Sequence, residues 1–225
     1  MDSCTSETIR LTVLRSTIEE RVTNLSRLIS IDLTSPAATK SQIQDDIDRL
    51  LRLGLGDQAR DIYLTSRSSV IRHRVRQLQF GGDTVSYMID YSDVFFKLIR
   101  NTCEWFGVSF HDPSMASGFM KWIQKEVTEF SHIFRKQTFQ MQHEFHIIAD
   151  CVITVTGQCQ SLSDIGLDIT SFFDKLIQDD LIAAIEDYAR KCDFQILEAV
   201  KADNLELLEP AVELFEDSGV RFGMF

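Results

Sequence analysis

The apolar residues of this chain recur at steps of three and four over almost its whole length. In the first run they are Leu11, Leu14, Ile18, Val22, Leu25 and Leu28. This spacing places apolar side chains along one face of an α-helix, whereas a half-buried strand needs strict alternation. Only 3 prolines and 10 glycines occur in 225 residues, so long stretches are free to be helical. We therefore predict an all-α protein, an elongated rod of tandem antiparallel helical bundles.

Proline and glycine mark the expected helix ends in the first half of the chain. Pro36 forbids continuation of the first helix, and Ser35 is suited to cap the second. Gly54 is a good stop for that second helix. A third helix is expected over 57–80, where the "GGD" of residues 81–83 breaks or bends the chain.

The second half of the chain contains longer periodic runs. A fourth helix is expected to stop near Phe110, and Pro113 suits the first position of the next helix. The following run keeps its period from Phe119 to Val155, about forty residues, and is predicted to be one helix. It includes the β-branched stretch "IIADCVITVT", a strand candidate in isolation, which we assign to helix because its neighbours have helical spacing.

Another helix is expected after Gly157, and a last short one near residues 204–215, kinked at Pro210. The predicted domains are a first helical bundle over residues 1–110 and a second over residues 111–225.

An arginine cluster stands out in "RSSVIRHRVRQLQFGGD", residues 67–83, because the chain as a whole has a net charge of −11. The cations are Arg67, Arg72, Arg74 and Arg76, and no acid precedes Asp83. Three interpretations are open. The arginines could pair with acids of neighbouring helices, contact an acidic protein partner or this chain's own acidic residues 179–217, or face an anionic membrane. We favour the acidic partner. Nucleic acid is not expected, because the positive charge is local.

No motif predicts catalysis, a cofactor or a metal. "HEFH" at residues 143–146 places its two histidines three apart, not the four of a zinc-binding helix, and lacks a third ligand nearby. Asp45, Asp46 and Asp48 resemble the start of a calcium loop but lack its central glycine and closing glutamate. The "LGLGD" at residues 53–57 follows a helix and no "GK[ST]" follows it, so it is predicted to be a helix stop and turn.

The five cysteines contain no C-x-x-C pair, and their number is odd. They are expected to be reduced thiols of a cytosolic protein. The N-terminus has no apolar segment of the kind found in signal peptides.

Several long blocks, in order, resemble the C-terminal region of the exocyst component of the eighty-four type, especially its fungal versions. The blocks cover roughly residues 27–177 and are "RLISIDLTSPAATKSQI" (27–43), "LLRLGLGDQARDIYLTSRSSVIRHRVRQLQFGGD" (50–83), "FFKLIRNTCEWF" (95–106), "MASGFMKW" (115–122) and "IGLDITSFFDKL" (165–176). In the family an acid commonly precedes the final "GD" of the second block. Gly81 stands there in this chain, which widens the backbone options of the turn.

The resemblance implies a non-catalytic subunit of the exocyst, which tethers secretory vesicles to the plasma membrane before fusion. It implies a helical-bundle fold, no cofactor, the other exocyst subunits as partners, and a cytoplasmic location at vesicles and sites of polarised secretion. Family members carry a coiled-coil helix and a pleckstrin-homology domain upstream, so this chain is expected to be a short version or a fragment. The alternative function is a generic helical adaptor that binds an acidic protein partner.

Overall fold

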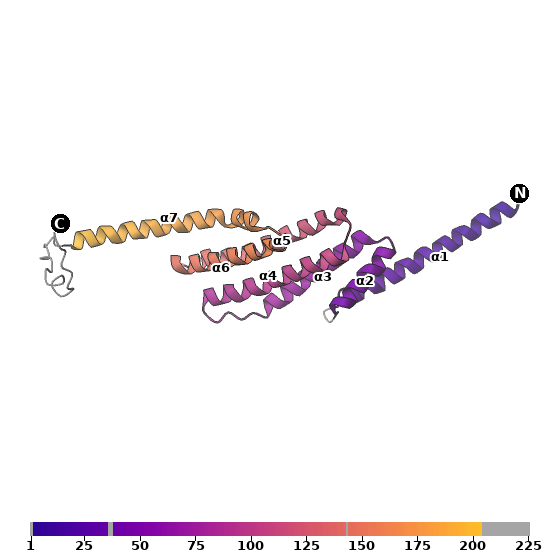
Figure 1. Cartoon of the computed structure of the whole chain (residues 1–225), viewed down its shortest axis with the longest axis horizontal. Helices are drawn as coiled ribbons and strands as arrows, with labels where there is room; N and C mark the ends of the chain where they lie inside the picture. Colours follow the sequence, from indigo (N-terminus) through magenta and orange to yellow (C-terminus); the bar gives the residue numbers. More distant parts are fainter. Residues whose placement is uncertain (1, 36–37, 143, 204–225) are drawn as a thin grey trace, which may run out of the picture. The chain divides into compact units, whose positions relative to one another are not determined.

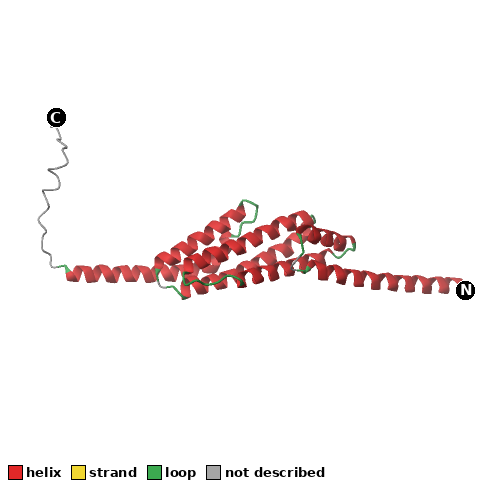
Figure 2. Cartoon of the chain, turned by 90° about the horizontal axis from the view of Figure 1, so that it is seen from below, coloured by secondary structure: helices red, strands yellow, loops and turns green. Residues whose placement is uncertain are grey.

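The computed structural model of the chain describes residues 2–35, 38–142 and 144–203, with side chains from residue 10 onward. This part contains seven α-helices and no strand, so the predicted all-α class is confirmed (Figures 1 and 2). The α-helices are α1 (Asp2–Leu33), α2 (Lys40–Arg52), α3 (Gly56–Arg76), α4 (Thr84–Ser109), α5 (Ala116–Arg135), α6 (Phe145–Ser163) and α7 (Thr170–Ala202). A 3₁₀ turn, η1 (Pro113–Met115), precedes α5, and a π-helix, η2 (Lys136–Gln140), follows it.

The chain divides into two compact units, residues 1–184 and 185–225. The boundary between the two units falls within the residue range of α7. The predicted rod and the predicted bundle boundary at residues 110 and 111 stay predictions.

The core of the first unit is a single cluster to which every one of its helices contributes. Aromatic rings form its centre, where Phe130 of α5 stacks on Tyr91 and Phe95 of α4 at centroid distances of 4.8 and 4.6 Å. Phe173 of α7 packs against the same ring at 6.0 Å. Apolar area removed from water in this way is the main stabilising contribution to a bundle.

Most of the aromatic residues with helical spacing are buried as their periodicity predicts. Phe95, Trp122, Phe130 and Phe134 are buried, each at 8% exposure or less. Leu98 and Trp105, which share the same spacing on α4, are only partly buried. The period therefore identifies the core face of a helix but not the depth of each residue on it.

Local capping explains where α2 and α4 begin. The N-cap of α2 is Thr39, which forms a capping box with Gln42, so the prediction that Ser35 caps this helix is wrong. Asp83 caps α4, and its carboxylate accepts hydrogen bonds from the backbone N–H groups of Val85 and Ser86. Before it, Gly82 has a φ of 93°, a conformation that favours glycine, whereas Gly81 has no such requirement.

Two predicted helix limits in the second half are wrong. The periodic run from Phe119 to Val155 is two helices, because η2 and the residues after it interrupt the chain between α5 and α6. Gly157 lies inside α6, and the turn before α7 contains Gly166, at a φ of 83°. The stretch "IIADCVITVT" is helical within α6, as predicted. The helix predicted near residues 204–215 lies outside the described residues.

Candidate interaction surface

Three arginines of the predicted cluster lie exposed on the last two turns of α3. Arg72, Arg74 and Arg76 follow the buried Ile71, and the partly buried Val75 lies between the last two. Among the described residues, no carboxylate lies within ion-pair distance of any of the three. We call Arg72, Arg74 and Arg76 the arginine face.

A pocket of about 250 Å³ is lined in part by two residues of the arginine face. Its charged lining consists of Arg72 and Arg76 of α3 and Glu126 and Glu129 of α5. Its apolar lining consists of Ile71, Val75, Tyr91, Phe95, Phe130 and Ile133. Arg74 is not part of the pocket, so the three cations do not all point to one place.

Arg67 is separated from the arginine face, although it belongs to the same cluster in sequence. It is only 7% exposed, and its Nε donates a hydrogen bond to the Thr102 hydroxyl of α4 at 3.1 Å. Its guanidinium lies 4.9 Å from the ring centroid of Trp105. Burial lowers the pKa of Arg67, because a low-dielectric environment disfavours its charged form.

A buried polar network joins α3 to α5, and no sequence motif indicated it. Ser68 donates a hydrogen bond to the Glu126 carboxylate at 2.5 Å and accepts one from the indole N–H of Trp122 at 2.8 Å. All three residues are buried. The sequence did contain a signal for this network. Ser68 and Glu126 have the same helical spacing as the apolar residues of their helices, and a polar side chain on such a buried face requires a hydrogen-bond partner.

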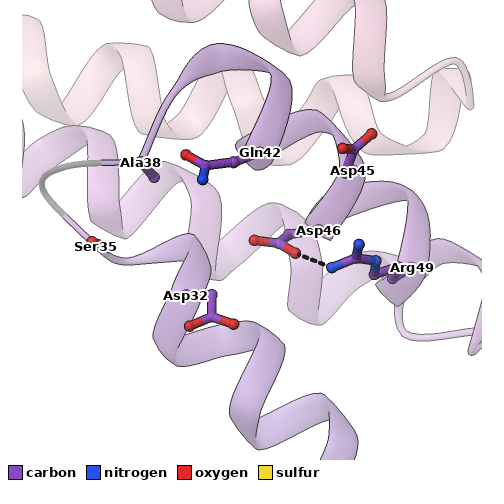
Figure 3. A pocket seen from close by; sticks show the side chains of 7 residues that line it. All are labelled: Asp32, Ser35, Ala38, Gln42, Asp45, Asp46 and Arg49. Atoms are coloured by element: carbon purple, nitrogen blue, oxygen red, sulfur yellow. Dashed lines mark hydrogen bonds and ion pairs between the residues drawn. The ribbon is translucent and has the colours of Figure 1, made fainter.

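A second pocket, of about 410 Å³, lies between the end of α1 and α2 (Figure 3). Asp32 of α1 and Asp46 of α2 both line this pocket, and Asp46 forms an ion pair of 2.9 Å with Arg49. Burial raises the pKa of Asp46, and the neighbouring Asp32 adds to the effect, whereas Arg49 opposes it.

Replacing Asp46 with Asn is expected to raise stability near pH 7, and the gain should shrink as the pH falls. The folded chain holds the Asp46 proton more tightly than the unfolded chain, whose carboxyl titrates near 3.8. The wild-type chain therefore becomes more stable as the pH falls through the raised pKa, until Asp46 is neutral like Asn. The lost ion pair counts for little, because the Arg49 side chain is 62% exposed.

Urea denaturation of both proteins between pH 4 and pH 7.5 measures this difference. The exposed Asp45→Asn is the matched control and should give a much smaller change. A stability difference that stays constant or grows towards low pH would contradict the assignment.

The metal-like motifs do not assemble into a site in the described part of the chain. Asp45 and Asp48 are exposed and Asp46 is buried, all within α2. Glu144 and His146 lie on the surface, with 3.5 Å between Glu144 Oε2 and His146 Nδ1, while His143 lies outside the described residues. Across residues 2–35, 38–142 and 144–203, no group of three His, Cys, Asp or Glu side chains is placed to hold a metal ion.

The two glycines of "LGLGD" have structural roles. Gly54 has a φ of 74° after the end of α2, and a Cβ on Gly56 would lie 2.7 Å from the Met115 methyl. The predicted helix stop and turn is confirmed. None of the helices within the described ranges combines the length and apolarity that crossing a bilayer requires.

Comparison with known proteins gives one consistent result. The family described as Exocyst component 84 C-terminal matches residues 1–170. The chain is 35% identical over 167 residues to Exocyst complex component EXO84 of Cryptococcus neoformans, a match that covers 74% of this chain and 25% of that protein. It is 30% identical over 202 residues to human Exocyst complex component 8, covering 86% of this chain and 27% of the human protein. The chain thus spans about a quarter of the length of these relatives.

Proposed function

Because the chain belongs to the Exocyst component 84 C-terminal family, we propose that it is a non-catalytic subunit of the exocyst that helps to tether secretory vesicles to the plasma membrane before fusion. The matched relatives carry names that make them components of the exocyst complex. The family description names a component of a complex and no catalytic activity. We place the protein in the cytoplasm, at vesicles and at sites of polarised secretion.

The observation that carries the proposal further is the arginine face. Arg72, Arg74 and Arg76 are exposed cations, and in the described residues no acid pairs with them. On a chain with net charge −11, such a face complements an acidic surface. We therefore assign the arginine face to contact with another exocyst subunit. Charge at this contact would act mainly on the rate of encounter and on the choice of partner.

An anionic membrane is the weaker candidate for the arginine face. Arg72 and Arg76 line one pocket and Arg74 lies outside it, so the cations diverge, whereas a bilayer surface is flat. The generic adaptor stays an alternative function, since its acidic partner would use the same arginines.

Changing Arg72, Arg74 and Arg76 together to Glu is expected to weaken assembly with the other exocyst subunits without unfolding the chain. We expect the association rate to fall about ten-fold or more at low salt. The difference should shrink as salt rises, because the Debye length is about 8 Å at physiological ionic strength. Affinity purification of the tagged chain followed by mass spectrometry identifies the partners, and biosensor kinetics give the rate.

The matched control changes Arg52, Lys121 and Lys125 to Glu. These three cations are also exposed, and the triple change alters the net charge equally. Assembly of the arginine-face variant at the rate of the control variant would overturn the assignment of the surface. Recovery of an acidic partner without any exocyst subunit would favour the generic adaptor.

A further inference from the structure

Arg67 is a buried cation without a counter-ion. It is 7% exposed, and no carboxylate of the described residues lies within ion-pair distance of it. Its one hydrogen bond leaves from Nε and reaches the neutral Thr102 hydroxyl. A guanidinium removed from water in this way bears a large desolvation penalty, which an opposite charge normally offsets. The fold itself supplies no such charge.

The outer end of the Arg67 guanidinium is still reachable from outside. In the described part of the chain, the only side-chain nitrogen and oxygen atoms that are both sealed from solvent and without a partner are the hydroxyls of Ser109 and Thr138. The terminal nitrogens of Arg67 form no hydrogen bond there, so they must retain contact with solvent. They therefore form a fork of N–H donors without an acceptor among the described residues.

A second cation lies against the same indole ring. Lys40, the first residue of α2, places its Nζ 5.8 Å from the ring centroid of Trp105, and the Arg67 guanidinium lies 4.9 Å from that centroid. Lys40 is exposed and, among the described residues, has no acid within ion-pair distance. Two cations, one from α2 and one from α3, thus lie near one partly buried tryptophan of α4.

We propose that Lys40, Arg67 and Trp105 form a binding site for a carboxylate side chain of an acidic partner protein. The carboxylate would accept hydrogen bonds from the terminal nitrogens of Arg67 and from Nζ of Lys40, beside the Trp105 ring. A planar guanidinium fork matches a carboxylate in this manner. Arginine and tryptophan, together with tyrosine, are enriched among the residues that dominate binding energy at protein interfaces.

The burial of Arg67 favours a side chain over a membrane as the ligand. A flat bilayer engages cations that protrude, whereas Arg67 is more than nine-tenths buried. A glutamate carries its charge at the end of a thin, flexible side chain and can approach such a guanidinium. The site contains none of the three arginines of the arginine face, so either surface can fail its test while the other stands.

The test is a titration of the whole chain, followed by NMR, with a peptide of eight glutamates whose ends are blocked. The indole N–H signals of the two tryptophans are separated by a Trp122→Phe spectrum. We expect the Trp105 signal to move and saturate with the glutamate peptide and to stay in place with eight glutamines. Lys40→Glu should weaken binding about ten-fold or more, whereas Arg52→Glu, an equal charge change on the same helix, should change it less than about two-fold.

Arg67→Met separates binding from folding. Methionine fills a similar volume without a charge, so the thermal midpoint should stay equal or rise while binding of the glutamate peptide is lost. Should this variant fail to fold, the comparison of Lys40→Glu with Arg52→Glu decides alone. Equal binding by those two variants, or a Trp105 signal that the glutamate peptide leaves in place, overturns the proposal. A response only to a phosphoserine peptide or to phosphatidylserine vesicles also overturns it, in favour of a phosphate ligand.

Discussion

Replacing Phe130 with Ala should lower the free energy of unfolding by about 3–5 kcal/mol, the usual cost of truncating a fully buried phenylalanine. Phe130 is 1% exposed, and its ring contacts rings from α4, α5 and α7. Few neighbours can close the resulting cavity, because the surrounding rings are themselves held by one another. Chemical denaturation followed by circular dichroism measures the change.

Phe194→Ala is the matched control, because the same side chain is removed from a position that is 64% exposed. It should change the stability by less than about 0.5 kcal/mol. A loss under about 1 kcal/mol for Phe130→Ala would show that the aromatic centre is not close-packed.

Replacing Ser68 with Ala should cost about 3 kcal/mol, more than loss of an ordinary hydroxyl, because two buried partners lose their hydrogen bonds together. The Glu126 carboxylate would lose its donor, and the Trp122 indole N–H would lose its acceptor. Both groups stay buried between α3 and α5, so water cannot easily replace the hydroxyl.

Ser69→Ala provides the comparison one residue along the same helix. Its hydroxyl is exposed and bonds only to the backbone carbonyl of Thr65, so stability should stay within about 0.5 kcal/mol of wild type. Equal effects of the two substitutions would mean that the network contributes nothing beyond helix propensity.

The helices could be predicted from the sequence because their apolar period is local information, but one interruption could not. The apolar positions keep a helical phase across the end of α5, because Met141 follows Phe134 by seven residues, two helical turns, and Phe145 follows Met141 by four. Met141 is 61% exposed, so its place in the apolar pattern does not correspond to burial. Gly157 and Gly166 were likewise alike in sequence, and only the second has the positive φ that ends a helix.

The candidate site was only partly predictable. Arg67 lies in step with Tyr63, Leu64 and Ile71, so its helical face could have separated it from the arginine face. Its approach to Trp105, and the arrival of Lys40 at the same ring, depend on how α2, α3 and α4 pack. Periodicity carries no information on such contacts between helices.

The buried side chains of helix α7 all lie near its beginning. Phe173 and Ile177 are buried, and Asp180 forms an ion pair with Arg135, but beyond Asp180 no described side chain of the helix is buried. From there on, its backbone order rests on helix propagation and on surface pairs such as Asp187 with Lys191. The amide hydrogens of α7 beyond Asp180 will therefore exchange with solvent through local fraying of this part of the helix, at a rate insensitive to mild denaturant. Amides near Phe173 will exchange only when the bundle opens as a whole, so one continuous helix has two separate opening equilibria.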